Sequence, residues 1–377
     1  MLFPTLPDIL TEADPSLKSA ALNGYDAIEN AVLAALYFRR MEIREAQVQE
    51  ANKDTCSWIF EDPEEHQKPW SNFVRWLREE TGCYWIEGKA GCGKSTLMKF
   101  LRSDARTLNA LKEWTGSDEL ITASYFFWMA GTALQKNQEG LLRSLLHTIL
   151  TRRRDLIARV FPRQYNAMMT NHGATVHASQ HDNDECGLLT VSELKKAFTT
   201  LAKQNVKGFK ICLFIDGLDE YVGDQFEIVD LFKTITTNSF MIKAVISSRP
   251  EPTFVEAFHD SPSLRVEDLT SGDIDHYVQS KLLAHSKMQN HRRQGSELGA
   301  KLTHSIASKA CGVFLWVFLV VRSLLECLSD GSYPEDLERI IETYPEELHE
   351  LYQHMFKRMK PSHRDEAFRL FQAIHHA

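Results

Sequence analysis

The N-terminal part of the chain has a helical pattern of apolar positions. Between residues 17 and 52, hydrophobic side chains recur at the spacing of one helix face, and charged side chains occupy the opposite face. The apolar stripe consists of Ala20, Ala21, Ile28, Val32, Leu33, Leu36 and Phe38. We predict a helix over this range, and another part of the protein has to cover its stripe.

The middle of the chain alternates between two kinds of pattern. A helical pattern over residues 70–79 is followed by a short apolar strand at 83–87. The segments predicted after it are a helix from residue 94, a strand at 121–128, helices at 138–152 and 191–204, a strand at 210–215, a helix at 226–236 and a strand at 242–247. This alternation predicts an α/β fold in which helices flank a parallel sheet.

Two regions depart from that alternation. Residues 171–187 are small, polar and rich in histidine, and we predict a mobile insertion there. From residue 273 onward every periodic segment is helical, which predicts an all-α domain. The apolar run at 313–321 is too short to cross a bilayer and Arg322 follows it, so we expect a buried helix and no integral membrane segment.

Composition and charge narrow the classes of partner. A hydrophobic content of 43% and a charged content of 25% are those of a globular protein. The 43 Lys and Arg residues against 51 Asp and Glu residues give a net charge of -8, so we expect no nucleic-acid partner. The 7 cysteines are scattered without a C-x-x-C pair, and no secretory signal is visible. Together these features predict that the protein is located in the reducing cytoplasm.

A glycine-rich segment carries the most specific chemistry. Residues 88–95 read Gly-Lys-Ala-Gly-Cys-Gly-Lys-Ser and match G-x-x-x-x-G-K-[ST] at every fixed position. In such a P-loop, backbone N–H groups surround the β-phosphate, Lys94 neutralises the β- and γ-phosphates, and the Ser95 hydroxyl is a ligand of Mg²⁺. The predicted nucleotide-binding residues are Gly88, Lys89, Ala90, Gly91, Cys92, Gly93, Lys94, Ser95 and Thr96.

A second acidic segment complements the loop. The predicted strand at 210–215 is followed directly by Asp216, the position from which a carboxylate holds Mg²⁺ in P-loop proteins. Asp219 and Glu220 come just after it, and we expect one of them to position the water that attacks the γ-phosphate. Arg249 follows the strand at 242–247, and its forked donors suit a γ-phosphate sensor.

Together these residues resemble the NACHT group of signal-transducing P-loop ATPases, the STAND class, and in particular its fungal members of nonself recognition and heterokaryon incompatibility. The resemblance rests on WIEGKAGCGKST at 85–96, FIDGLDEY at 214–221, SSRP at 247–250, and the segment from Asp268 to Val278. It covers residues 38–377. In the helical domain, Phe314 stands where related proteins have a proline against the adenine.

The resemblance implies a domain order and a role. We expect an N-terminal helical segment at 1–69, a NACHT-like P-loop domain at 70–270, a helical domain at 271–360, and the start of a truncated winged-helix domain at 361–377. The implied ligands are ATP or ADP, with GTP as an alternative, and Mg²⁺. The implied partners are further copies of the chain in the active state and an unidentified effector or sensor protein.

Three functions remain open on the sequence. The first is a nucleotide-controlled signalling switch with slow ATPase turnover. The second is a non-hydrolysing interaction scaffold that nucleotide stabilises. The third is a small-molecule or nucleoside kinase, which the all-α C-terminal region and the Asp-Gly-Leu-Asp-Glu sequence at 216–220 disfavour.

Several other signals favour a structural interpretation. Residues 182–193 nearly spell a calcium loop, but no helix is predicted to enter it. His172, His177 and His181 lack the fixed spacing of metal ligands. Cys92 lies at a helix N-terminus that favours thiolates, yet we interpret it as a small filler of the loop.

Overall fold

A computed structural model gives the architecture of the chain. It describes residues 15–52, 55–64, 70–170, 189–203, 208–237, 239–293 and 297–358, together with residues 364, 366–370 and 372. The predicted insertion at 171–187, with its histidines and most of the calcium-loop candidate, and most of the expected winged-helix start lie outside the described residues.

A five-stranded parallel sheet forms the centre of the molecule, as the alternating pattern predicted. Its strands are β1 (Gly82–Glu87), β2 (Glu119–Phe126), β3 (Phe209–Asp216), β4 (Ile242–Ser248) and β5 (Ser263–Arg265). They lie in the order β2-β3-β4-β1-β5, so β4 separates the strand before the glycine loop from the strand that ends at Asp216. The C-terminal ends of β1, β3 and β4 therefore meet at one edge of the sheet.

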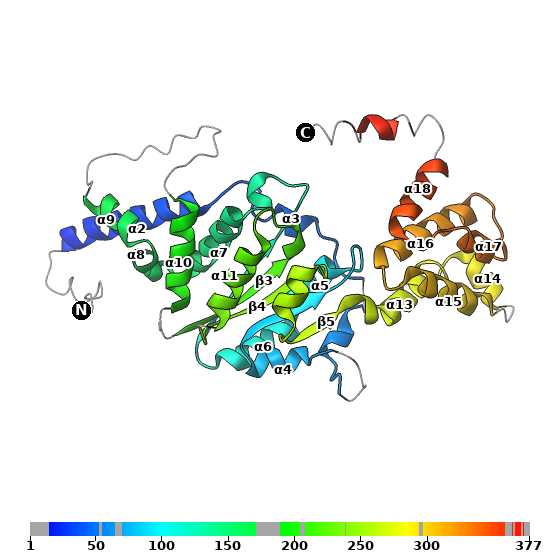
Figure 1. Ribbon diagram of the computed structural model, residues 1–377, viewed down its shortest axis with the longest axis horizontal. Coiled ribbons are helices and arrows are strands. Elements are labelled where there is room, and N and C mark those ends of the chain that lie inside the picture. Colours follow the sequence, from blue (N-terminus) through cyan, green and yellow to red (C-terminus); the bar gives the residue numbers. More distant parts are fainter. Residues whose placement is uncertain are drawn as a thin grey trace.

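Helices cover both faces of the sheet, and alternate residues of each strand supply the two cores. In β1, Cys83 and Trp85 enter one core whereas Tyr84 and Ile86 enter the other. The first core is packed by α2 (Pro15–Leu36), α7 (Gln138–Arg152), α8 (Ile157–Val160), α10 (Val191–Lys203), α11 (Gln225–Thr237) and α12 (Pro252–Phe258). The second is packed by α4 (Phe73–Glu79), α5 (Lys94–Ser103) and α6 (Ala105–Thr115). Figure 1 shows both layers on the sheet.

The single helix predicted over 17–52 is wrong in one respect. The structure has α2, a turn, and a separate short helix α3 (Ile43–Gln47). Arg40 in the turn has a positive φ of 73°, which a continuous helix does not allow. Helix α2 packs on α7 and on α9 (Pro162–Thr170), and Ile28, Val32, Leu33 and Leu36 of its apolar stripe are buried.

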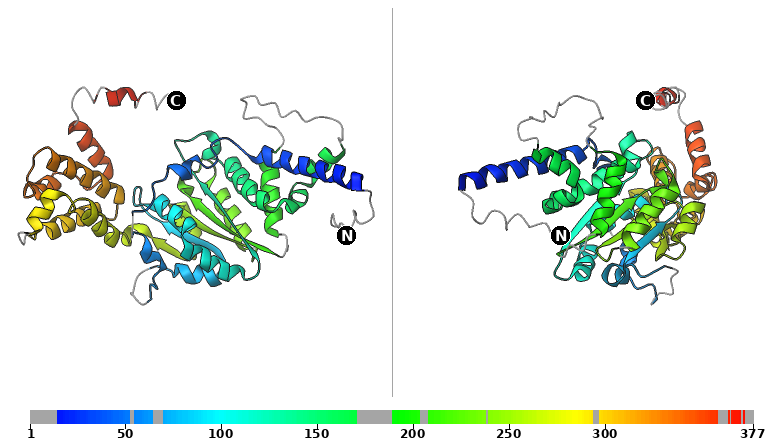
Figure 2. Two further views of the ribbon diagram at one scale, coloured as in Figure 1. Left: turned by 180° about the vertical axis from the view of Figure 1, so that it is seen from behind. Right: turned by 60° about the vertical axis from the view of Figure 1, so that its left-hand side comes forward.

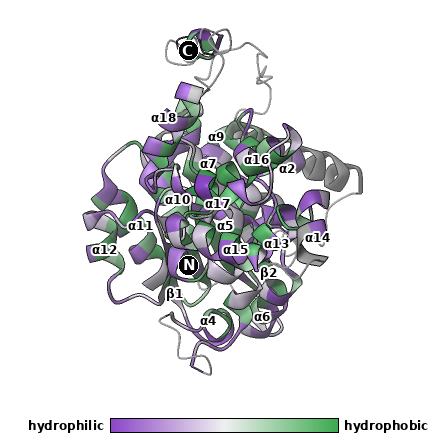
Figure 3. Cartoon of the chain, turned by 90° about the vertical axis from the view of Figure 1, so that its right-hand side faces the viewer, coloured by the Kyte–Doolittle hydropathy of each residue, from purple (hydrophilic) through white to green (hydrophobic). Residues whose placement is uncertain are grey.

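A helical module with its own core follows the sheet. It comprises α13 (Ser271–Lys281), α14 (Ser286–Arg293), α15 (Leu298–Ala310), α16 (Phe314–Ser329), α17 (Asp336–Glu342) and α18 (Leu348–Arg358). Its core contains Trp316, Val320 and Leu324 of α16, the helix that carries the long apolar run. Figure 2 shows this module at the opposite end of the molecule from α2, and in Figure 3 its helices carry both hydrophobic and hydrophilic residues.

Within the described ranges, no helix is both long and apolar enough to cross a membrane.

Short 3-10 turns lie between several of the helices and strands in the described part of the chain. They are η1 (Ser57–Phe60), η2 (Ala133–Gln135), η4 (Leu218–Glu220) and η5 (Val266–Asp268), and a fifth, η3 (Arg154–Leu156), follows α7. Of these, η4 directly follows β3 and carries the acidic pair of the predicted site. At the C-terminal edge of the sheet, η4 follows β3 and η5 follows β5, and such irregular segments are where side chains can converge on a ligand.

Candidate nucleotide site

The glycine loop turns sharply between β1 and α5. Gly91 and Gly93 have φ angles of 76° and 108°, in the left-handed region that glycine tolerates best. The Gly88 N–H donates to the carbonyl of Ser248 at 3.2 Å, which fixes the start of the loop to the end of β4. The loop thus has the strand-loop-helix context that the sequence motif requires.

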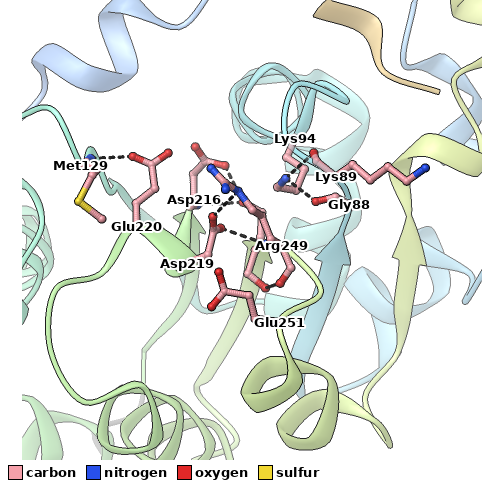
Figure 4. Close-up of polar contacts among 12 residues, drawn as sticks. Gly88, Lys89, Lys94, Met129, Asp216, Asp219, Glu220, Arg249 and Glu251 are labelled. Carbon is pink, nitrogen blue, oxygen red and sulfur yellow. Dashed lines mark hydrogen bonds and ion pairs between the residues drawn. The ribbon is translucent and has the colours of Figure 1, made fainter. Parts of the chain in front are cut away.

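Lys94 begins α5 and turns its side chain back over the loop. Its Nζ donates to the carbonyl oxygens of Gly88 at 2.6 Å and Lys89 at 3.0 Å (Figure 4). These contacts hold the ammonium beside the N-terminal end of α5, where the helix dipole also favours an anion. The amide of Lys89 instead donates to Glu267 Oε2 at 3.2 Å.

Cys92 lies inside the loop and is almost fully buried. Burial raises the pKa of its thiol to about 11, and this outweighs the opposing effects of Lys94 and the backbone amides. Its Sγ fills the space beside Gly88, where an added Cβ would approach it to 2.6 Å. The interpretation of Cys92 as a small filler residue agrees with this packing.

Asp216 ends β3 and is buried. The Ser247 hydroxyl of the adjacent strand β4 donates to Asp216 Oδ1 at 2.6 Å, and the Gly217 N–H donates to the same hydroxyl oxygen at 3.0 Å. Burial raises the pKa of Asp216, while the hydrogen bonds from Ser247 and Ser95 and the charges of Lys94 and Arg44 act against this rise. Ser95 and Asp216, the two predicted metal ligands, are therefore neighbours.

Asp219 and Arg249 form a close pair across the ends of β3 and β4. Asp219 Oδ2 lies 2.9 Å from Arg249 Nε, and its Oδ1 accepts the Arg249 backbone N–H at 3.0 Å. The Asp219 side chain is 5% exposed and that of Arg249 is 51% exposed. The predicted sensor arginine is thus held by one of the two predicted water-positioning carboxylates.

Glu220 makes a different contact from its neighbour. Its Oε2 accepts the Met129 N–H at 2.6 Å, so the side chain points toward the segment after β2, away from Arg249 (Figure 4). Its other oxygen lies near Gly217, 3.8 Å from where a Cβ of that residue would stand. One oxygen of Glu220 is therefore directed toward the end of β3.

A cavity of about 650 Å³ connects these groups. Among the predicted residues, its walls contain Ala90, Gly91, Cys92, Gly93, Lys94, Ser95, Thr96, Asp216, Asp219, Glu220 and Arg249. Gly88 and Lys89 do not line it. Its size is in the range of small-molecule sites, which are roughly 300–1,000 Å³.

The helical module closes one side of this cavity. The Leu315 N–H donates to the Gly91 carbonyl at 2.9 Å, and Phe314 contributes to the cavity wall. The ring of Phe314 packs edge-on against Tyr277, with ring centroids 5.2 Å apart. The cavity therefore has a polar end at the loop and an aromatic end at the module.

Asp273 of α13 ties this module to the segment around η1. Its carboxylate accepts the Cys56 N–H at 3.0 Å and the Trp58 indole N–H at 2.9 Å. The carboxylate is largely buried, and burial raises its pKa although both hydrogen bonds oppose the rise. Asp273, Cys56 and Trp58 all line the cavity as well.

These groups fit a magnesium-bound nucleoside triphosphate by their donor chemistry. Lys94 and the loop amides are donors suited to phosphate oxygens, and Ser95 and Asp216 are the oxygen ligands that Mg²⁺ prefers. The aromatic end of the cavity, with Phe314 and Tyr277, has the apolar surface that a base requires.

Several residues of this site had no predicted role, among them Ser247, Asp273 and Arg44. Ser247 lay inside the quoted SSRP sequence, and its position before the sensor arginine was the available signal. Asp273 lay inside the segment from Asp268 to Val278 that carries part of the resemblance, but no contact or role was predicted for it. Arg44 belonged to the charged face of the N-terminal helical pattern, where no sequence feature distinguishes it from its neighbours.

Comparison with known proteins places the central part of the chain in a family. No curated protein matches the chain. The model of the family described as Nephrocystin 3, N-terminal, matches residues 54–249, which begin before η1 and end at Arg249. This region contains the glycine loop, Asp216 and the Asp219–Arg249 pair, and it covers more than half of the sequence. The chain therefore belongs to the Nephrocystin 3 N-terminal family.

Proposed function

We propose that this chain is a nucleotide-controlled signalling switch of the NACHT-like STAND class, which binds ATP or GTP with Mg²⁺ and hydrolyses it slowly. The observation that carries the proposal is the convergence of Lys94, Ser95, Asp216 and Arg249 on one cavity that α16 also lines. A site built from two parts of the chain suits a switch, because a ligand held between them can change how they associate.

Each residue has a defined part in this proposal. Lys94 and the loop amides bind the phosphates, and Ser95 and Asp216 hold the metal. Bound Mg²⁺ would neutralise charge on the β- and γ-phosphate oxygens. Arg249 leaves Asp219 to contact the γ-phosphate, which makes Asp219 available to orient a water molecule, and Glu220 is the alternative residue for that role. The proposed readout is assembly with further copies or with an effector protein in the cytoplasm.

The proposal is tested by the nucleotide content and the mass of the purified protein. Protein denatured after purification should release nucleotide, and Lys94→Ala should release much less. ATP and GTP should change the mass in solution of the wild type but not of Lys94→Ala. A wild type that neither carries nor binds nucleotide overturns the proposal.

The second candidate is a scaffold that binds nucleotide without hydrolysing it. It is favoured by the contacts of the acidic pair, because Asp219 is engaged by Arg249 and Glu220 by the Met129 amide. Phosphate release by the wild type and by Glu220→Gln separates the two candidates. Turnover in the wild type that Glu220→Gln abolishes supports the enzyme, whereas binding without turnover in the wild type supports the scaffold.

A further inference from the structure

Arg44 reaches the nucleotide cavity from outside the P-loop motif. It lies in the short helix α3, far before the loop in sequence, yet its side chain lines the same cavity as Lys94, Asp216 and Glu220. Neither the glycine motif nor the acidic motif contains it, and it precedes the region that the family model matches. An additional positive charge is thus present where the phosphates of the proposed nucleotide would lie.

The guanidinium of Arg44 has a donor that the protein does not use. Its Nε is buried and has no hydrogen-bond partner. The centre of the guanidinium lies 5.7 Å from the centroid of the Trp128 ring, which follows β2 at the same edge of the sheet. A buried donor without a partner is unfavourable, so an acceptor that reached the Arg44 Nε would be bound more strongly.

Glu45, the residue after Arg44, fixes α3 to α5, the helix that follows the glycine loop. Glu45 Oε1 pairs with Arg102 of α5, and its Oε2 accepts the Ser124 hydroxyl of β2 at 2.8 Å. The Glu45 side chain is 18% exposed, so this link is shielded from solvent. Because α5 begins at Lys94, the link sets the position of Arg44 relative to the phosphate-binding lysine.

A second link fixes the chain just after α3. Lys99 of α5 donates from Nζ to the Val48 carbonyl at 2.7 Å and lies 2.8 Å from the Glu50 carboxylate. Glu45 before this point and Glu50 after it both pair with basic residues of α5. Arg44 is presented by a segment that is held at two points, as a preorganised binding residue requires.

The position of Arg44 favours the terminal phosphate over the base. Its aromatic neighbour Trp128 follows β2, on the far side of β3 from the strand β1 that leads into the loop. The aromatic end of the cavity is built by Phe314 and Tyr277 of the helical module instead. In an extended triphosphate, the group that lies beyond Lys94 and next to Asp216 is the γ-phosphate.

We propose that Arg44 binds the γ-phosphate of the nucleoside triphosphate and so makes α3 part of the nucleotide sensor. This inference rests on the proposed function and names a further residue of the same site. Arg249 is paired with Asp219, whereas the Nε of Arg44 is available, so Arg44 is the arginine that can engage first. Bound triphosphate then attaches α3 directly to the ligand, and bound diphosphate does not.

The test compares the equilibrium affinities of MgATP and MgADP for the wild type, Arg44→Ala and Arg44→Lys. Loss of a charge-assisted hydrogen bond should weaken MgATP binding by Arg44→Ala about 10- to 100-fold and MgADP binding less than about 3-fold. Arg44→Lys keeps the positive charge without the forked donors of arginine, and its affinity for MgATP should lie between those of the wild type and Arg44→Ala. Arg39→Ala removes an exposed arginine of the same segment and should leave both affinities unchanged.

The outcomes separate this inference from the function on which it rests. A wild type that binds neither nucleotide overturns the proposed function and the inference with it. A wild type that binds MgATP with an affinity that Arg44→Ala does not change, or changes equally for MgADP, overturns the inference alone. Thermal unfolding of each variant identifies a folding defect. If Arg44→Ala is defective, the folded Arg44→Lys tests the inference, because it must discriminate less between MgATP and MgADP than the wild type does.

Discussion

The hydroxyl of Ser247 donates a 2.6 Å hydrogen bond to the buried carboxylate of Asp216, from the strand next to it in the sheet. Asp216 is the last residue of β3 and Ser247 is the last but one of the adjacent parallel strand β4, so the sheet itself brings the donor to the acid. A serine in this position satisfies one oxygen of a carboxylate that water barely reaches.

The first prediction concerns the cost of the Asp216 charge. Because burial raises its pKa, the folded protein is destabilised by ionisation, and this loss grows as the pH rises above the unfolded pKa. Asp216→Asn keeps an oxygen for Ser247 and should be more stable than the wild type at pH 7, by on the order of 1 kcal/mol. The difference in free energy of unfolding should shrink toward pH 4 in urea titrations. A variant less stable than the wild type at pH 7 contradicts this account.

The second prediction concerns Lys243, which is fully buried in β4. Its Nζ donates to the Trp76 and Leu77 carbonyls at 3.0 Å each and lies 4.2 Å from the centroid of the Trp114 ring. Burial lowers its pKa to about 8, although these contacts favour the charged form. Between this value and the ordinary value of 10.5, the unfolded chain binds the proton more tightly than the folded one.

The stability of the wild type should therefore rise with pH in that window relative to Lys243→Met. The slope is at most about 1.4 kcal/mol per pH unit, since a single proton is involved. Chemical denaturation of both proteins at several values between pH 7.5 and 10 measures the difference, and groups common to both proteins cancel. Parallel pH profiles would show that Lys243 keeps an ordinary pKa.

The third prediction uses two glycines of the loop as a matched pair. A Cβ at Gly91 would lie 3.0 Å from the Leu315 Cβ, whereas a Cβ at Gly93 would meet nothing within 4 Å. Both residues have positive φ angles, so both alanine variants carry backbone strain. Only Gly91→Ala should also push α16 from the loop, and the Leu315 amide should then exchange hydrogen faster. Equal exchange in the two variants would contradict a direct contact.

The fourth prediction concerns thiol reactivity. Cys92 is buried with a pKa raised to about 11, whereas Cys311 is exposed. Alkylation of the native protein at pH 7.5, followed by peptide mass spectrometry, should label Cys311 well before Cys92, because the thiolate is the reactive form. Labelling of Cys92 at a similar rate would mean that the loop opens on the timescale of the reaction.

The sequence predicted the parts of the fold with long, regular patterns. The helix predicted at 138–152 has the bounds of α7, and the strands before the loop and before Asp216 agree to within two residues. The short strand β5 was not predicted, because only Leu264 of its three residues is buried and one apolar residue has no period. The order of the strands was not predicted either, since no local pattern records which strands become neighbours.

The residues of the candidate site likewise fall into those that the sequence predicted and those that it did not. The loop, Asp216, Asp219 and Arg249 follow strand ends, so the parallel sheet places them at one edge. Arg44 and Asp273 reach the cavity only through tertiary contacts of α3 and α13, which their local sequences do not reveal. The pairing of Asp219 with Arg249 likewise depends on the order of β3 and β4.

The hydrogen bond between Cys56 and Asp273 also bears on how the chain is made. The two residues are separated by 217 positions, so a ribosome needs roughly 10 to 45 seconds to proceed from one to the other at about 5–20 residues per second. During that interval the wall of the cavity formed by Trp58 lacks its partner from α13. The cavity of the candidate site is thus completed only after the strands of the sheet that supports it have been synthesised.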